Sequence, residues 1–120
     1  MDLIGINNMI PIPNKMREEM EADPFMKKCV WSGEISKEKV SWEHCWNYAG
    51  RKINEKWAIV PLRVDLNVNI SGNVKEYCRY VSLTRATNED LEKYPKKNWQ
   101  QLKKYLNKKY EGKKHSDSFL

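Results

Sequence analysis

The stretch that decides the fold runs from residue 42 to residue 62 and reads WEHCWNYAGRKINEKWAIVPL. Its first residues belong to KVSWEH at residues 39–44, a segment with β-branched and aromatic residues that predicts a short strand. It ends in WAIVPL at residues 57–62, an apolar run too short for a helix, in which Pro61 requires a strand end or a sheet edge. Between the two, YAGR at residues 48–51 interrupts the chain. We therefore expect two strands separated by an irregular segment.

Before this stretch, the sequence predicts one short helix and one further strand. NKMREEMEA at residues 14–22 is typical of a helix, with Asn14 as a candidate N-cap, and Asp23-Pro24 then ends it. CVW at residues 29–31 is strand-like, and Ser32-Gly33 predicts a turn.

After this stretch, the sequence predicts three helices. Apolar residues at helical spacing favour a helix over residues 74–85, and Thr87 followed by acidic residues predicts the N-cap of a short second one. The third helix ends at Gly112 and carries an aromatic and leucine stripe that we expect to pack in the core. The stripe consists of Trp99, Leu102, Tyr105, Leu106 and Tyr110.

Length and composition indicate one compact domain with tails. The chain has 120 residues, of which 40% are hydrophobic and 32% charged, so it is too short for two ordinary domains and too apolar to be disordered throughout. We expect an N-terminal arm and short helix over residues 1–27, a domain over residues 28–111 and a flexible tail over residues 112–120. The sequence has neither a membrane-length apolar run nor a secretory signal, which favours a cytoplasmic protein with no membrane partner.

The positive charge is concentrated near the C-terminus. The formal net charge is +6, yet the segment from Lys93 to Lys114 alone holds nine lysines and one acid, Glu111. Such a block suits phosphate, in nucleic acid or on a membrane surface, and the alternative is a solvated lysine face that keeps the protein in solution.

The three cysteines do not indicate a disulfide framework. Cys29, Cys45 and Cys78 are odd in number and widely spaced, without a C-x-x-C pair. A structural zinc site built from them and His44 is conceivable but lacks paired ligand spacing, so we expect reduced, buried thiols instead.

The strongest chemical signal is Glu43 next to His44 at the end of a predicted strand. A carboxylate is a hard ligand for a divalent cation, and an imidazole can accept a proton from water. Alternation turns neighbouring strand residues to opposite faces, but at a frayed strand end both can reach one site. The alternative is an ordinary surface pair.

About two thirds of the chain resembles small phage and prophage proteins of the HNH endonuclease superfamily. The specific part is the E-H…Y-A-G-R-x-I-N-E-x-W-A-I-x-P-L block within residues 42–62, preceded by C-x-x-S-G at residues 29–33. It continues as RYVSL-x-RAT at residues 79–87, DL-x-x-YP at residues 90–95 and W-x-x-L at residues 99–102.

The resemblance implies an α+β fold with a small ββα-metal core and additional C-terminal helices. In that core His44 is the general base, Glu43 is a metal ligand, and the start of the following helix supplies further ligands, here Asp65 and Asn67. The implied cofactor is one divalent ion, Mg²⁺, Mn²⁺ or Ni²⁺, held beside a scissile phosphodiester.

The sequence departs from the family pattern at functional positions. Relatives have paired zinc ligands where this chain has Cys29 with Ser32, and then Arg63, so a structural zinc is not expected. The usual distal histidine is Asn67 in this chain. The asparagine that orients the base is replaced by Ala58, which leaves the tautomer of His44 to another group.

Two accounts of function remain open. In the first, the protein is a metal-dependent DNA endonuclease; in the second, it is an inactive scaffold retained for binding nucleic acid or for regulation. Both predict basic contacts to DNA, more than RNA, through Arg51, Lys52, Arg63, Lys96, Lys97, Lys103, Lys104, Lys108 and Lys109. Arg51 either clamps a phosphate or pairs with Glu55 beside a tight turn. A third class is an inhibitor whose tryptophan-rich surface binds another protein.

Overall fold

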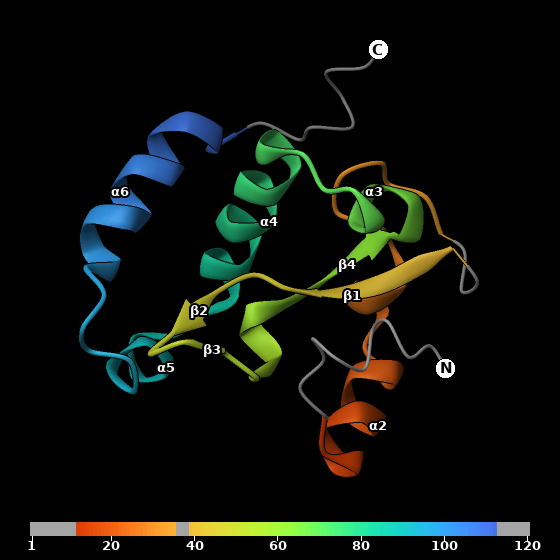
Figure 1. The fold of residues 1–120 in the computed structure, drawn as a ribbon, viewed down its shortest axis with the longest axis horizontal. Helices are drawn as coiled ribbons and strands as arrows, with labels where there is room; N and C mark the ends of the chain where they lie inside the picture. The colour runs from red at the N-terminus through yellow and green to blue at the C-terminus, as the bar shows by residue number, and fades with distance from the viewer. Residues whose placement is uncertain (1–11, 36–38, 113–120) are drawn as a thin grey trace.

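The centre of the structure is an antiparallel pair of strands, β1 (Val40–His44) and β4 (Ile59–Arg63) (Figure 1). The structure, a computed structural model, describes residues 12–35 and 39–112. Both strands of the 42–62 region are confirmed, although β4 begins two residues later than predicted because Trp57 and Ala58 form a 3-10 turn. Pro61 is tolerated in β4 because each strand of a two-stranded sheet has an edge that needs no ladder partner.

Helices and short antiparallel strands together give the described chain an α+β fold. In chain order the elements are α2 (Asn14–Ala22), η1 (Pro24–Lys27), β1 (Val40–His44), β2 (Asn47–Tyr48), β3 (Arg51–Lys52), η2 (Lys56–Ala58), β4 (Ile59–Arg63), α3 (Val64–Val68), α4 (Gly72–Arg85), α5 (Asn88–Glu92) and α6 (Trp99–Tyr110). No described helix is long and apolar enough to cross a membrane.

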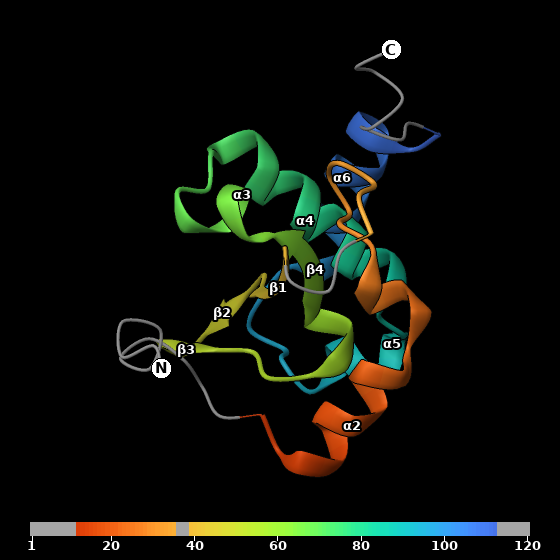
Figure 2. The same cartoon turned by 90° about the vertical axis from the view of Figure 1, so that its right-hand side faces the viewer.

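The β1–β4 pair is covered on both faces, with α2 and η1 on one side and α3 and α4 on the other (Figure 2). Directly opposed residues of an antiparallel pair share a face. Trp42 and Ile59 pack with Met20 and Met26 beneath the sheet. Val60, opposite Glu43, is fully buried in the main core on the other side. The two clusters together fix which way each side chain of β1 points.

The main core joins the sheet to α4, α5 and α6. Trp46, Trp57 and Trp99 meet edge to face, with ring centroids 5.1 Å apart for Trp46 and Trp99 and 5.9 Å for Trp57 and Trp99. The predicted stripe of α6 is confirmed at Trp99 and Leu106, which are buried, whereas Tyr105 is 53% exposed. The edge-to-face contacts add specific geometry to the burial of large apolar area.

The helix signals in the sequence are confirmed, with one correction. Thr87 forms a reciprocal capping box with Asp90 at the start of α5, and Ser71 caps α4 by accepting a hydrogen bond from Val74 N at 3.3 Å. Asn14, the predicted N-cap of α2, is instead its first helical residue, and Pro13 takes the cap position with no side-chain cap. Proline suits the start of a helix because its backbone has no N–H to satisfy.

The segment CVW at residues 29–31 is not the strand that the sequence predicts. It forms a turn closed by a 2.9 Å hydrogen bond from Gly33 N to Cys29 O, and the predicted Ser32-Gly33 turn is part of it. The backbone curls around the Cys29 sulfur, which accepts from Ser32 N at 3.4 Å and from Arg63 N at 3.3 Å. Residues 1–11 of the predicted arm and 113–120 of the predicted tail lie outside the described residues.

YAGR at residues 48–51 forms the tight turn of a hairpin between β2 and β3. Ala49 and Gly50 have φ angles of 53° and 81°, and two consecutive positive φ angles are typical of the two-residue turns that match strand twist. Glu55, one of the two alternative partners considered for Arg51, pairs with Lys93 at 3.6 Å and accepts a hydrogen bond from Tyr94. The hairpin thereby brings β3 back beside the end of β1.

Candidate functional site

His44 ends β1 and is held by Asn54. Its Nε2 donates a hydrogen bond of 3.1 Å to Asn54 Oδ1, which leaves the lone pair on Nδ1. Burial lowers the pKa of His44 from the ordinary value of 6.5, and the hydrogen bond to Asn54 opposes part of this effect. The imidazole is therefore neutral near pH 7 and able to accept a proton at Nδ1.

Asn54 was not among the site residues predicted from the sequence. We expected the orienting position at Ala58, but Ala58 is fully buried and has no polar side-chain atom. Asn54 reaches His44 because Ile53 N bonds Trp46 O at 2.8 Å and draws the chain after β3 back along the end of β1. The available signal was the asparagine inside the INE segment of the specific block, ten positions beyond His44.

Glu43 faces the opposite side of the sheet from His44. It lies across from Val60, whereas His44 lies across from Ile59, so alternation persists to the last residue of β1. Burial raises the pKa of Glu43 above its ordinary value of 4.5, although the charges of Lys52, Lys75 and Arg79 act to lower it. The carboxyl group is thus half-buried, and the charges of three cations act on it without forming an ion pair.

Asp65 and Asn67 both follow β4, but they make different contacts. Asp65 is held by the Arg63 guanidinium through two parallel hydrogen bonds of 2.6 Å, and this pairing lowers the pKa of the exposed Asp65 carboxyl. Asn67 Nδ2 donates to Ser41 Oγ at 3.0 Å, which places the amide on the same face of β1 as Glu43. Arg63 also pairs with Glu34 at 3.5 Å.

These donors do not fit a divalent ion held as a resident cofactor. Within residues 12–35 and 39–112, no three His, Cys, Asp or Glu side chains gather in a way that would hold a metal. Glu43 and His44 point away from each other, and both oxygens of Asp65 are bound by Arg63. Cations around Glu43 further oppose a bound divalent cation.

The cysteines are free and buried. Burial raises the pKa of Cys78 to about 12 and that of Cys45 well above its ordinary value, so both stay protonated near pH 7.

The structure divides the predicted phosphate contacts into two kinds. Arg63 is paired with Asp65 and Glu34, and Lys109 lies 2.6 Å from Glu76. The other predicted contacts make no ion pair within the described part of the chain; they are Arg51, Lys52, Lys96, Lys97, Lys103, Lys104 and Lys108.

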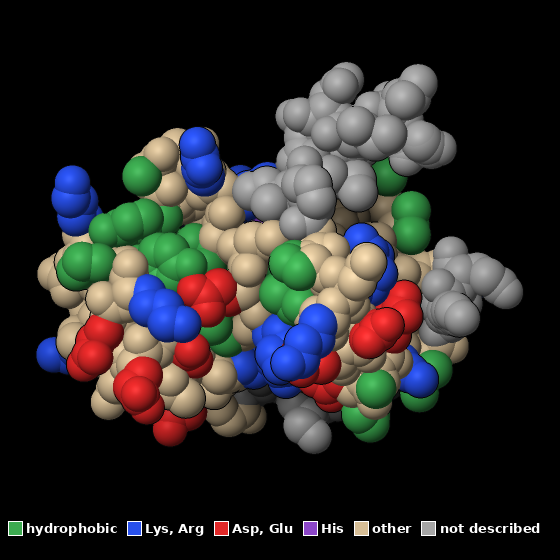
Figure 3. All heavy atoms as spheres, turned by 90° about the horizontal axis from the view of Figure 1, so that it is seen from below, with side chains coloured by type: hydrophobic (Ala, Val, Ile, Leu, Met, Phe, Trp, Pro, Cys, Tyr) green, Lys and Arg blue, Asp and Glu red, His purple; other side chains and the backbone are tan. Residues whose placement is uncertain are grey.

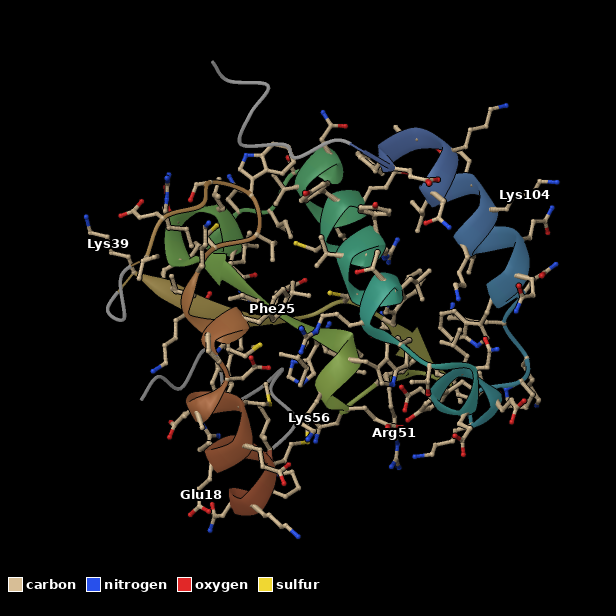
Figure 4. All side chains as sticks on the ribbon, turned by 180° about the vertical axis from the view of Figure 1, so that it is seen from behind. Glu18, Phe25, Lys39, Arg51, Lys56 and Lys104 are labelled. Carbon is tan, nitrogen blue, oxygen red and sulfur yellow. The ribbon has the colours of Figure 1, made fainter. Side chains whose placement is uncertain are left out.

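These basic residues do not all share one surface. Figure 4 shows Lys104 on the outer side of α6 and Arg51 at a different edge of the molecule. On the face seen in Figure 3, basic and acidic side chains are interspersed, so this face carries no continuous basic field. Any phosphate-binding surface on this protein is therefore formed by a local group of cations.

Comparison with known proteins found no matching family model, no matching curated protein and no matching solved structure.

Proposed function

We propose that this protein binds nucleic acid, DNA more than RNA, through the phosphate backbone, on a scaffold of HNH type that has lost its resident metal. In this proposal β1, β4 and α3 correspond to the two strands and the helix of a ββα core. The observation that carries it is a group of cations near the end of β1: Arg79 Nε donates to Cys45 O at 3.1 Å, and the charges of Arg79, Lys52 and Lys75 all act on the half-buried Glu43.

The charge balance of this group favours an anionic ligand. Lys52 comes from β3, and Lys75 and Arg79 from one side of α4, since residues four apart on a helix are neighbours. None of the three forms an ion pair with a described residue. Backbone phosphates supply the missing negative charge without requiring any base contact, so the proposal implies little sequence preference.

Salt dependence tests this proposal. We expect fluorescence anisotropy with a labelled 20-base-pair duplex, recorded in EDTA between 50 and 200 mM KCl, to show affinity falling steeply with salt. Each neutralised phosphate contributes a log–log slope of about −0.9, so four contacts give about −3.6. A labelled single strand and a duplex RNA of equal length serve as comparisons. Binding that is absent or independent of salt would contradict the proposal and leave the protein-binding inhibitor as the remaining class.

A second candidate, hydrolysis of the bound phosphodiester, is favoured by the His44–Asn54 pair. A neutral imidazole held in one tautomer by an amide oxygen is an arrangement suited to a general base, which would take a proton from water at Nδ1. The remaining predicted partners are not gathered beside it.

Plasmid nicking in Mg²⁺, Mn²⁺ or Ni²⁺ separates the two candidates. The binding proposal expects no nicking that depends on His44, so the wild type, His44→Ala, Asn54→Ala and Glu43→Ala give equal backgrounds. Nicking that is lost in His44→Ala and reduced in Asn54→Ala, with DNA binding unchanged, would establish hydrolysis and refute the inactive scaffold.

A further inference from the structure

Two cations lie over the same buried tryptophan. Trp46 is 4% exposed, and its Nε1 donates to Ser82 Oγ at 2.7 Å. The Arg79 Cζ lies 5.1 Å from the centroid of the Trp46 ring, and the Lys97 Nζ lies 5.8 Å from it. Both distances are within the range of cation–π attraction. The indole therefore positions one cation from α4 and one from the loop before α6.

Arg79 is further fixed by a backbone contact. Its Nε donates to Cys45 O at 3.1 Å, directly after the Glu43–His44 pair in sequence. This bond uses one of the five guanidinium donors and leaves the two terminal nitrogens outside it. A guanidinium held in place loses less conformational entropy when it binds a phosphate than a freely moving one does.

No acid in the described chain forms an ion pair with these two cations. By contrast, Arg63, Arg85 and Lys109 are each matched to a carboxylate. The charge of Arg79 acts on Glu43, as do the charges of Lys52 and Lys75. Like charges near one ring repel each other, and a phosphate bound to each cation offsets that repulsion.

We infer that Arg79 and Lys97 bind neighbouring phosphates of a nucleic acid strand at the edge of Trp46, with Lys52 and Lys75 extending the contact toward Glu43. This inference rests on the proposed function and specifies its surface. Arg79 and Lys75 were not among the phosphate contacts predicted from the sequence. Lys97 was predicted together with the lysines of α6, and this inference assigns it to a different surface. The strand would run from the end of β1 toward the loop that precedes α6.

The test is duplex binding measured by anisotropy in EDTA, so that hydrolysis plays no part. The variants are Arg79→Gln, Arg79→Lys and Lys97→Gln, and the matched control is Lys28→Gln, which removes an exposed lysine outside this group. We expect Arg79→Gln and Lys97→Gln each to weaken binding about tenfold at 100 mM salt and to reduce the salt slope by about 1. Arg79→Lys should recover most of the slope, and Lys28→Gln should match the wild type.

The outcomes separate this inference from the proposed function. No binding by the wild type would overturn both. Wild-type binding with Arg79→Gln and Lys97→Gln equal to Lys28→Gln would overturn the inference alone, because the contacts then lie elsewhere. Thermal melts accompany each variant. If Arg79→Gln is unfolded, Lys97→Gln and Arg79→Lys decide the matter, since the Lys97 side chain lies over Trp46 and forms no ion pair with a described residue.

Discussion

Glu43 and His44 are adjacent in the chain but differ in what surrounds them. His44 is oriented by an amide, whereas the charges of three cations act on Glu43, and burial disfavours the charged form of each. For His44 this means that protonation opposes folding. For Glu43 it means that ionisation opposes folding. Lowering the pH therefore destabilises the fold through His44, and raising the pH destabilises it through Glu43.

His44 is expected to titrate below 6.5 because burial lowers its pKa. Its contribution to stability is complete above pH 6.5, the unfolded value, and is lost as the pH falls toward the folded pKa. In Asn54→Ala the pKa should fall further, because the lost hydrogen bond stabilised the charged ring. NMR titration of the imidazole measures both values, and the nitrogen shifts should report the Nε2–H tautomer in the wild type only. A pKa unchanged by Asn54→Ala would contradict the role of Asn54.

Glu43→Gln is expected to stabilise the fold at neutral pH and to strengthen DNA binding. Because the pKa of Glu43 is raised in the folded state, the wild type loses stability as the pH rises from 4.5 through the folded pKa. Glu43→Gln avoids this loss, so the variant is more stable than the wild type above the folded pKa and gains nothing below pH 4.5. Removing a negative charge near a phosphate is worth about 1 kcal/mol in water, or about fivefold in affinity. Melting curves at pH 4 and pH 8 and anisotropy measure the two effects. Weaker DNA binding by Glu43→Gln would instead favour a metal ligand.

Among the helices and strands, the β2–β3 hairpin has the greatest influence on the candidate site. It returns β3 to the end of β1, which places Lys52 near both Glu43 and His44 and sets Asn54 against the imidazole. The turn contains Ala49 at a φ of 53°, a conformation that costs a residue with a Cβ about 1 kcal/mol.

Ala49→Asn is expected to stabilise the protein by about 0.5–1 kcal/mol, since Asn-Gly is the preferred pair for a turn with two positive φ angles. Gly50→Ala, at a φ of 81°, should destabilise it by about 1 kcal/mol although no atom lies within 4 Å of the added Cβ. Urea denaturation measures both variants. Equal effects of the two changes would show that the turn is not the hairpin turn described here.

The packing of α4 against α6 depends on Glu76. Its carboxylate accepts from Tyr110 Oη at 2.7 Å, from Lys109 Nζ at 2.6 Å and from Tyr105 Oη at 3.3 Å, and these contacts lower its pKa. The same acid removes Lys109 from the cations available to a ligand. Glu76 therefore joins two helices and restricts the basic surface of α6.

Glu76→Gln is expected to lower the free energy of unfolding by about 1 kcal/mol near pH 7, a modest value because Lys109 is about half exposed. The pKa of Glu76 is depressed, so its contribution is present above 4.5 and is lost as the pH falls through the folded value. The difference between variant and wild type should accordingly shrink in acid. Denaturation curves at pH 7 and pH 3 measure it, and a difference that persists at pH 3 would contradict the ionic origin.

Local signals in the chain were enough to predict most elements. These signals act over a few neighbouring residues, so the secondary structure that they favour can be predicted directly from the sequence. They are the strand-forming residues, the Thr87 capping box, Pro24 after Asp23, and the spacing of Trp99 and Leu106. The strand predicted at residues 29–31 was wrong because a distant donor, Arg63 N, contributes to holding the Cys29 sulfur. A contact between residues so far apart in the chain produces no periodic pattern in the sequence.

The candidate site was decided by the tertiary structure. Adjacency in sequence suggested one shared site for Glu43 and His44, but pairing with β4 directs them to opposite faces. Their actual neighbours, Asn54 for His44 and Arg79 for Glu43, come from segments that a hairpin and a helix bring back across the sheet. Residue chemistry is local and can be stated from the chain, whereas the direction of a side chain depends on strand register, which only the packed core selects.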